Sequence, residues 1–329
     1  MEQGLSYWQF APESQYLDRK SARKKPLELL RHLIAFANAE GGQLVIGIED
    51  EKRNNIITGF KDGNAYPIEE FEKLGIKAVY TKKNAGNMSD YCPLENQVQG
   101  IQKENRKKLL EELNLEGKQE VMAFQTHSAN VFVIDENIEK YYYEKECDID
   151  GFLTKRKDVA IFTFYADCLP IFVYDKKNEV IGVWHSGWPG TFKGMMKSGL
   201  QKMKEVFGTV SKDVLMGLGI GMQQKYYEVG LDFYENFVNK FGKESELIQK
   251  SFKWNENTGK YHFDNTKFNE IMALSLGIKP ENLIVSYEDT FGEIDELGNR
   301  SDKFHSHRRE GKNAGRATAM ISFLWKIDS

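Results

Sequence analysis

The stretch ADCLPIFVYDKKNEVIGVWHSGWPGT, residues 166–191, predicts a β-hairpin. Two short apolar runs, LPIFVYD and EVIGVWH, are rich in β-branched and aromatic residues and are separated by the charged KKN. A turn centred on Lys176 and Lys177 would place Cys168 directly opposite His185. Opposed residues have Cβ atoms about 4.5–5.5 Å apart, which suits two ligands of one metal ion. A longer loop with a bulge would shift this register by one residue.

Pro170 lies near the start of the first run. Proline has no amide hydrogen to donate to a ladder. We therefore expect this strand to lie at a sheet edge or to begin after Pro170.

Outward from the hairpin, strands and helices are mixed without strict alternation. We expect strands at EVMAFQTH, ending on His127, and at ANVFVID, GFLT, DVAIFTFYADC, DVLMGLGIG and NLIVSYED. We expect helices at QKENRKKLLEEL, at TFKGMMKSGLQKMKEVFG (stopped by Gly208), and around LDFYENFVNKFG and NTKFNEIMALSLG. The C-terminal GRATAMISFLWK fits either a helix or a strand. This pattern predicts a layered α/β or α+β sandwich.

Composition describes an ordinary globular chain. The 329 residues are 40% hydrophobic and 29% charged, enough for one large domain or two smaller ones. A net charge of −4 gives no support to general binding of nucleic acid or membrane surfaces. The first residues, MEQGLSYWQF, lack a signal-peptide pattern, and no apolar run is long enough to span a bilayer. Three dispersed cysteines fit a reducing compartment, so we expect a cytoplasmic protein without a membrane role.

The first 60 residues read as a separate α/β unit. PLELLRHLIAFANA predicts a helix, and QLVIGIED and IITGF predict strands. The polar, glycine-bearing KDGNAYP, residues 61–67, is the candidate boundary, to within about ten residues.

Three residues at or just after predicted strand ends could hold a metal ion: His127, Cys168 and His185. Two imidazoles and a thiolate leave a fourth position of a tetrahedral zinc site open, as in catalytic zinc sites. Asp167 could orient a histidine or accept a proton. The alternative is structural: a buried cysteine, a histidine packed under tryptophan, and an exposed histidine at a strand end.

The segment FHSHRREGKNAGR, residues 304–316, is basic and glycine-bearing. Guanidinium groups bind phosphate in a bidentate manner, so Arg308, Arg309 and Arg316 could hold an anionic substrate. The alternative is a solvated basic loop. His305 and His307 are further candidate ligands, although their spacing does not require it.

Six motifs occur in a characteristic order: QTHSANV, DIDGFLT, ADCLPIFVYD, VIGVWHSGWPGT, YYEVG and SHRREGKNAGR. Together they resemble the bacterial laccase-domain family, also called polyphenol oxidase-like or YfiH-type proteins, over roughly residues 75 to 326. The resemblance implies a laccase domain at 75–329 with a layered α/β sandwich of the cysteine-hydrolase-like type. It also implies a zinc or copper site at His127, Cys168 and His185.

The activity that the resemblance implies is phosphorolysis of purine nucleosides, namely adenosine, inosine, guanosine and methylthioadenosine. Adenosine deamination accompanies it, and an older assignment is copper-dependent oxidation of phenols. Six histidines are too few for the copper cluster of a multicopper oxidase. The H-x-E and P-C-x-x-C signature of zinc deaminases is absent. We therefore expect a phosphorylase whose partners are a purine nucleoside and phosphate.

Site roles follow from this expectation. We assign catalytic roles to Asp167 and Cys168. Substrate or phosphate binding is assigned to a set of polar and basic residues, namely Gln125, Ser186, Thr191, Arg308 and Arg309.

The chain departs from the family pattern at several positions. Pro189 replaces a basic residue, Ile220 a proline, Asp289 a cysteine and His307 a tyrosine, and a GGVS-like segment is reduced to NAGNMS. None of these positions is one of the three candidate ligands. They bear on substrate range and rate.

Residues 1–65 have their own resemblance. ESQYLDRKSA, AFANAEGG and VIGIED are similar to the front of a Schlafen/AlbA-like domain, which here is truncated. A basic group near its start could meet phosphates; it comprises Lys20, Arg23, Lys24 and Lys25. We favour the interpretation that this unit packs on the enzyme and binds nothing.

Two other function classes stay open. One is a phosphate-independent metal or cysteine hydrolase, such as an amidase acting on cell-wall precursors. The other is a nucleic-acid-binding regulator that uses the N-terminal unit. The metal, the preferred purine and the oligomeric state are left open by the sequence.

Overall fold

The computed structural model describes residues 17–20, 43–46, 65–92, 98–136, 147–294 and 300–325. The chain divides into two compact units, Met1–Gly63 and Asn64–Ser329. In the first unit, β1 (Leu17–Lys20) pairs in parallel with β2 (Gln43–Ile46), and β2 lies within the predicted QLVIGIED strand. The predicted helix at 26–39, the strand at 56–60 and the basic residues 23–25 lie outside the described residues.

The second unit contains two large sheets. The six-stranded sheet has the order β15-β11-β9-β10-β7-β6 and the five-stranded sheet the order β3-β4-β16-β8-β5. The six strands are β6 (Val131–Val133), β7 (Gly151–Thr154), β9 (Leu169–Asp175), β10 (Val180–Ser186), β11 (Val214–Leu218) and β15 (Leu283–Val285). The five strands are β3 (Ala65–Pro67), β4 (Ile76–Thr81), β5 (Gln119–Val121), β8 (Val159–Tyr165) and β16 (Ala317–Phe323). Pairing is antiparallel except at β11–β15, β6–β7 and β5–β8, which are parallel.

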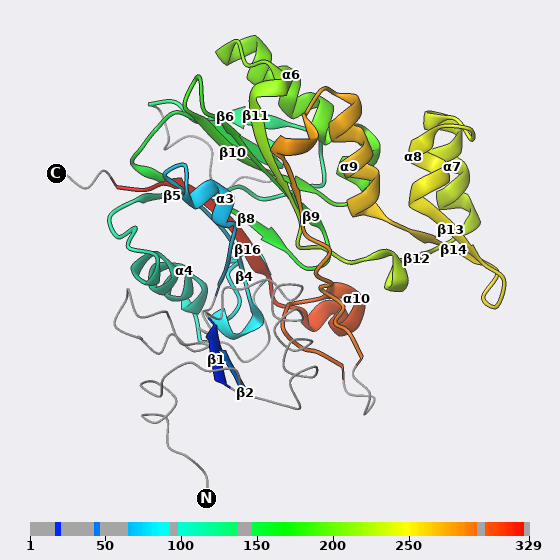
Figure 1. The fold of residues 1–329 in the computed structure, drawn as a ribbon, viewed down its shortest axis with the longest axis horizontal. Coiled ribbons are helices and arrows are strands. Elements are labelled where there is room, and N and C mark those ends of the chain that lie inside the picture. The colour runs from blue at the N-terminus through cyan, green and yellow to red at the C-terminus, as the bar shows by residue number, and fades with distance from the viewer. Residues whose placement is uncertain are drawn as a thin grey trace, which may run out of the picture. The chain divides into compact units, whose positions relative to one another are not determined.

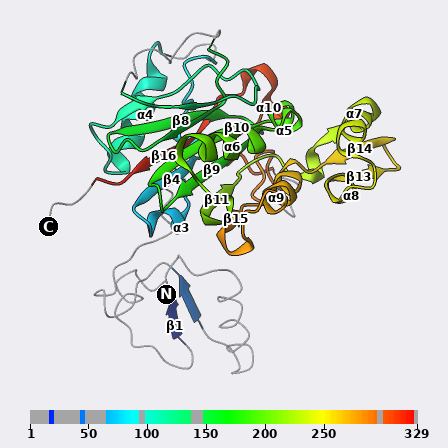
Figure 2. The same cartoon turned by 90° about the horizontal axis from the view of Figure 1, so that it is seen from above.

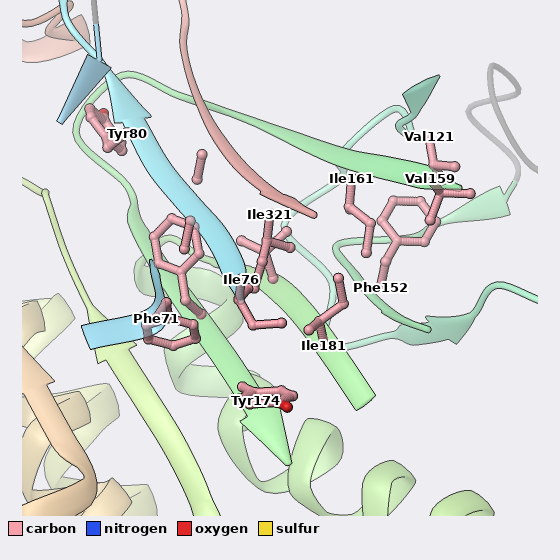
Figure 3. Packing of buried hydrophobic residues seen from close by; sticks show 14 of the residues in the cluster. Phe71, Ile76, Tyr80, Val121, Phe152, Val159, Ile161, Tyr174, Ile181 and Ile321 are labelled. Atoms are coloured by element: carbon pink, nitrogen blue, oxygen red, sulfur yellow. The ribbon is translucent and has the colours of Figure 1, made fainter. Parts of the chain in front are cut away.

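The main hydrophobic core lies between these two sheets (Figure 3). Phe152 and Ile181 come from the six-stranded sheet, and Val159, Ile161 and Ile321 come from the five-stranded sheet. Strands β8, β9 and β10 are buried on both faces, so they read as continuous apolar runs rather than alternating ones.

Helices cover the outer faces of both sheets (Figure 1). Helices α6 (Met195–Phe207) and α9 (Asn265–Ser275) pack on the six-stranded sheet, and α4 (Ile101–Glu112) packs on the five-stranded sheet. The result is a four-layer α–β–β–α sandwich, which confirms the predicted layered fold. The other α-helices are α3 (Glu69–Glu72), α5 (Trp188–Lys193), α7 (Leu231–Phe241), α8 (Glu246–Ser251) and α10 (His307–Glu310). The described 3-10 turns are η2 (Lys83–Ala85), η5 (Ser211–Asp213), η6 (Gln224–Tyr226), η7 (Pro280–Asn282) and η8 (Gly311–Asn313).

A smaller aromatic lobe stands beside the sandwich (Figure 2). It consists of α7, α8 and a three-stranded sheet formed by β12 (Glu228–Val229), β13 (Phe252–Asn255) and β14 (Lys260–Phe263). Its core is a cluster of phenylalanine rings that includes Phe233, Phe237 and Phe263. In the described part of the chain, no helix has the length and apolar character needed to cross a membrane.

The β9–β10 hairpin forms as predicted, but its register differs. Asp175 pairs with Val180, so the loop has four residues and His185 lies opposite Pro170. The Asp175 carboxylate explains the longer loop, because it accepts hydrogen bonds from the amides of Lys177 and Asn178 at 2.9 and 3.1 Å. The direct Cys168–His185 pairing is therefore wrong by two residues. A shift of two keeps every side chain on its face of the sheet, so both residues still lie on the same side.

The edge-strand expectation for Pro170 is also wrong. Strand β9 includes Pro170 and lies between β11 and β10. The Pro170 carbonyl accepts a hydrogen bond from Gly219, one residue past the end of β11. Its nitrogen faces the same side, beyond the last β11–β9 pair of Leu218 and Ile171, so the missing amide hydrogen affects only the end of this ladder.

Two other segments resolve as follows. The predicted long helix at 191–208 is two helices, α5 and α6, because Gly194 between them has a φ of 100°. Gly208 ends α6 as predicted. The ambiguous C-terminal segment forms the strand β16, central to the five-stranded sheet.

Candidate metal centre and its cavity

His127, Cys168 and His185 come together in the structure. One nitrogen of each imidazole and the cysteine sulfur all lie within 4.8 Å of one another. Cys168 Sγ is 3.7 Å from His127 Nε2. Tetrahedral zinc ligands at about 2.0–2.3 Å from the ion lie about 3.5 Å apart, so the observed spacing fits one ion.

The three residues reach the cluster from different elements. His185 is the penultimate residue of β10, and Cys168 lies in the short connection between β8 and β9. The predicted strand end at His127 is wrong, because β5 ends at Val121 and His127 lies in the following loop.

The backbone is strained at two positions beside the cluster. His127 has a φ of 59° and Asp167 a φ of 84°, in the left-handed region that non-glycine residues rarely adopt. Such conformations persist only where surrounding contacts enforce them. Asp150 holds the first position by accepting a hydrogen bond from the His127 amide at 3.0 Å.

Asp150 is the residue of the site that sequence reasoning missed. Its buried carboxylate accepts hydrogen bonds from the amides of Thr126, His127 and Ser128, from the Ser128 hydroxyl, and from His185 Nδ1 at 2.8 Å. One side chain thereby shapes the His127 loop and orients His185. The available signal was the motif DIDG, in which an acid directly precedes a strand.

Electrostatics favour a thiolate at the centre of the cluster. Burial raises the pKa of Cys168, but the charge of His185 and hydrogen bonds from His127 and His185 outweigh it and lower the pKa to about 6. Burial lowers the pKa of His185, but the Cys168 charge and the Asp150 hydrogen bond raise it to about 9. Burial likewise raises the pKa of Asp150, while hydrogen bonds from His185 and Ser128 bring it well below its usual range. A thiolate is the metal-binding form of cysteine.

The donor set fits a metal ion. Because Nδ1 of His185 faces Asp150, its Nε2 is left for the cluster, as is usual for an imidazole ligand with a carboxylate partner. Two imidazoles and one thiolate leave one open position. Among the described residues, His127, Cys168 and His185 form the one group with this geometry, and His305 is instead buried beside Gly86 and Glu310.

The cluster lies at one side of a cavity of about 680 Å³. Two kinds of side chain line it. Its aromatic walls are Tyr91, Phe124, Phe164, Trp188, Tyr227 and Phe233. Its polar and charged residues are Ser89, Gln125, Asp167, Asp232, His307, Arg308 and Arg316.

The three arginines of the basic segment have different surroundings. Arg308 and Arg316 line the cavity, and their guanidinium groups contact backbone carbonyls with no carboxylate partner among the residues that the structure describes. Arg309 does not line the cavity. Its guanidinium contacts the carbonyls of Thr290, Phe291 and Phe304 and the carboxylates of two acids, Asp302 and Glu310.

Two predicted substrate-binding hydroxyls lie away from the cavity. Ser186 and Thr191 are buried and hydrogen-bond to each other at 2.9 Å. Gln125 lines the cavity, but both atoms of its amide group bond the backbone of Phe164.

Asp167 lines the cavity and holds the basic segment. Its carboxylate accepts hydrogen bonds from the amide of Arg308 and the hydroxyl of Thr290, both at 2.7 Å. Through this hydrogen bond, Asp167 links the β8–β9 loop that carries Cys168 to helix α10.

The four single-residue departures from the family pattern differ in their burial. His307 lines the cavity, and Pro189 lies in the first turn of α5. Ile220 is buried and follows a cis peptide bond. Asp289 is 7% exposed, and within the described part of the chain one of its carboxylate oxygens has no hydrogen-bond partner.

A four-layer sandwich with a cysteine–histidine cluster at the side of a cavity defines an enzyme with a candidate metal site. The chain belongs to the multi-copper polyphenol oxidoreductase laccase family, whose model matches residues 78–324.

Relatives and solved structures agree with this membership. The chain is 29% identical to a purine nucleoside phosphorylase of Bacteroides thetaiotaomicron, over 66% of this chain and 78% of that protein. It is 28% identical to adenosine deaminase RL5 from an unidentified prokaryote, over 60% of this chain and 72% of that protein. The crystal structure of the hypothetical protein YfiH from Bacillus licheniformis has the same fold, with a TM-score of 0.68, 22% identity, and coverage of 80% of this chain and 98% of that one.

Proposed function

We propose that this protein is a metal-dependent purine nucleoside phosphorylase, which converts a purine nucleoside and phosphate to the free base and ribose 1-phosphate. The observation that carries the proposal is one cavity that joins a His–Cys–His cluster, aromatic walls and two guanidinium groups that have no carboxylate partner among the described residues. Relatives named purine nucleoside phosphorylase support it.

The metal ion that we propose is zinc, held by His127, Cys168 and His185. Two imidazoles and a thiolate in a tetrahedral arrangement are a common zinc donor set, and copper is the alternative. A zinc ion here would supply Lewis-acid chemistry at the open position.

Phosphate binding falls to Arg308 and Arg316 in this proposal. Both line the cavity, and neither guanidinium is neutralised by a carboxylate among the described residues. Guanidinium groups bind phosphate through charge-assisted, bidentate hydrogen bonds. Asp167 accepts the Arg308 amide, so we assign it the role of positioning Arg308.

The purine base would bind the aromatic walls. Trp188 is 44% exposed, lines the cavity, and meets Phe233 of the aromatic lobe edge-on at 5.1 Å between ring centroids. Flat bases stack on such rings in a sequence-tolerant way. Asp232 follows Leu231 at the start of α7 and lines the same cavity, which places a carboxylate within reach of the base.

A second candidate is a phosphate-independent hydrolase or deaminase. In space, Cys168 lies beside His185, and His185 bonds to Asp150. This arrangement matches a nucleophile, a base and an acid that orients the base. The relative named adenosine deaminase RL5 supports the deaminase form of this candidate.

For the N-terminal residues we propose a domain boundary near residue 65, with a truncated Schlafen/AlbA-like unit before it that takes no part in the reaction. Removing residues 1–63 would then leave nucleoside turnover unchanged. A large loss of turnover would contradict this. The three free cysteines are compatible with a reducing cytoplasm as the location of the enzyme.

The proposal is tested with adenosine and inosine as substrates, using protein stripped of metal and reloaded with zinc or copper. We expect cleavage only when both zinc and phosphate are present. Cleavage or deamination that is independent of phosphate would favour the second candidate. Activity that returns only with copper would correct the metal.

A further inference from the structure

The segment of residues 186–191, which ends β10 and begins α5, lies between two groups of side chains. On one side, Gly187 lies against the candidate metal cluster, where an added Cβ would be 2.6 Å from Cys168 Sγ and 2.9 Å from a ring carbon of His127. Real Cβ atoms essentially never come this close to another heavy atom. The Gly187 backbone therefore forms part of the wall around the cluster.

On the other side lies a buried polar network of four side chains. Ser186 is the last residue of β10, Thr191 lies in α5, and Asn265 and Asn269 come from the first turns of α9. All four are at most 4% exposed. The network lies outside the cavity lining, so it is not an additional substrate contact.

The Thr191 hydroxyl is the hub of this network. It donates to Asn265 Oδ1 at 2.7 Å, and it accepts from Asn269 Nδ2 at 3.1 Å and from the Ser186 hydroxyl at 2.9 Å. A hydroxyl has one donor and two acceptor positions, and here all three are used.

Asparagine side chains extend the network to the backbone. Asn265 Nδ2 donates to the Ser186 carbonyl at 2.9 Å, directly after His185. Asn269 Nδ2 donates to the Asn265 carbonyl at 2.8 Å, which ties both amides to the same end of α9. A fully satisfied buried network of this kind is rigid, because any displacement leaves a buried polar group without a partner.

We propose that Ser186, Thr191, Asn265 and Asn269 form a positioning network that holds the 186–191 segment against the His127–Cys168–His185 cluster and so sets the affinity of the cluster for a metal ion. The network touches neither the cavity nor the candidate ligands' donor atoms. It acts through the backbone of His185, Ser186 and Gly187. The inference rests on the metal site of the proposed function but not on the nucleoside reaction.

The test compares zinc affinity in matched threonine variants by competition with a chelator. Thr191→Val keeps the shape and removes the hub hydroxyl, while Thr191→Ser retains it. Thr154→Val is the control, because Thr154 is also buried and hydrogen-bonded but lies at the far end of the β7–β10 ladder from His185. Cobalt-loaded samples of each protein give a visible spectrum that reports ligand geometry independently of fold stability.

We expect Thr191→Val to weaken zinc binding about tenfold or more, as removal of supporting hydrogen bonds at metal sites does. Its cobalt spectrum is expected to change. Thr191→Ser and Thr154→Val are expected to bind zinc as the unchanged protein does, although Thr154→Val loses comparable thermal stability. Ser186→Ala removes a single hydrogen bond and is the milder variant if Thr191→Val does not fold, with a smaller loss of affinity expected.

Unchanged zinc affinity and an unchanged cobalt spectrum in Thr191→Val or Ser186→Ala would overturn the inference and leave the network a purely structural one. Equal losses in Thr191→Val and Thr154→Val would also overturn it. Since nucleoside turnover is not measured, a protein that binds zinc but cleaves no nucleoside would contradict the proposed function alone.

Discussion

A single carboxylate oxygen of Asp150 joins the two histidines of the cluster. Oδ1 lies 2.8 Å from Nδ1 of His185 and 3.0 Å from the backbone nitrogen of His127. The other oxygen accepts from the amide and hydroxyl of Ser128, both at 2.7 Å. The buried acid therefore fixes the relative positions of two residues from separate segments.

Replacing Asp150 with asparagine is expected to weaken zinc binding about 10–100-fold. An amide can accept on one atom only, so several donors would face an NH₂ group, at a cost of about 2–4 kcal/mol in the free energy of unfolding. Chelator competition and denaturant unfolding measure the two effects. Asp175→Asn is the control, since Asp175 is equally buried and accepts hydrogen bonds at the far end of the same hairpin. A similar loss of zinc affinity in both variants would refute the assigned role.

Gly187→Ala is expected to disrupt the cluster by steric overlap alone. Gly187 has a φ of −63°, which alanine adopts without strain, but the new Cβ would lie 2.6 Å from Cys168 Sγ. We expect zinc affinity to fall at least about tenfold, with an overpacking cost of about 1–3 kcal/mol. Gly217→Ala is the matched change within β11, where the nearest atoms are 3.4 Å away. Normal zinc binding by Gly187→Ala would show that the cluster is not packed in this way.

Arg308→Ala and Arg316→Ala are each expected to raise the KM for phosphate by about 10–100-fold, the effect of losing a hydrogen bond between charged groups. The KM for the nucleoside should change much less. Steady-state kinetics with varied phosphate give the result. Arg156→Ala removes a guanidinium that is already paired with Asp158 and should leave the phosphate KM unchanged. Equal phosphate KM values in all variants would exclude both arginines from the phosphate site.

Asp232 is expected to influence which purine is preferred. Its carboxylate makes no hydrogen bond or ion pair with the residues that the structure describes and lines the cavity. A carboxylate accepts from the 6-amino group of adenosine and opposes the 6-oxo group of inosine. Asp232→Asn should therefore shift kcat/KM toward inosine by about tenfold. Glu235→Gln, on the same helix but outside the cavity lining, is the control. An unchanged ratio would remove Asp232 from base recognition.

Asp289 makes stability depend on pH. Burial raises the pKa of the Asp289 carboxyl, and the charges of Glu293 and Asp167 raise it further. Hydrogen bonds from the Phe291 and Gln223 amides lower it in part, and the net pKa is about 6. The folded state therefore holds this proton more tightly than the unfolded state. The free energy of unfolding should fall as the pH rises from about 4 to 6, by at most about 3 kcal/mol from this group.

Asp289→Asn should remove this pH dependence and be more stable than the unchanged protein above pH 6. Urea unfolding at several pH values measures both. If the two proteins show parallel pH dependence, Asp289 is ionised in the folded state without penalty.

The fold and the cluster were predictable because both depend on local patterns. Apolar runs bounded by turns identify β8, β9 and β10. The two-residue error in the hairpin register did not move Cys168 and His185 to opposite faces, because side chains alternate with a period of two. The prediction of their proximity thus survived a wrong pairing.

The remaining features depend on contacts between distant segments. The acceptor role of Asp150 requires the 126–128 loop to fold around it. Arg308 and Arg309 are neighbours in the sequence, and only the short helix α10 turns one toward the cavity and the other toward backbone carbonyls. Pattern reasoning cannot separate two adjacent arginines.

The most direct test of the central claim follows the oxygen atoms of phosphate. Adenosine is incubated with the zinc-loaded protein and with phosphate labelled with a heavy oxygen isotope at all four oxygens, and the masses of the products are measured by mass spectrometry. Phosphorolysis predicts adenine and ribose 1-phosphate in which every phosphate oxygen is heavy, including the one bonded to the sugar. Unlabelled free ribose with adenine, or inosine formed at the same rate without phosphate, would contradict the account and identify a hydrolase or a deaminase.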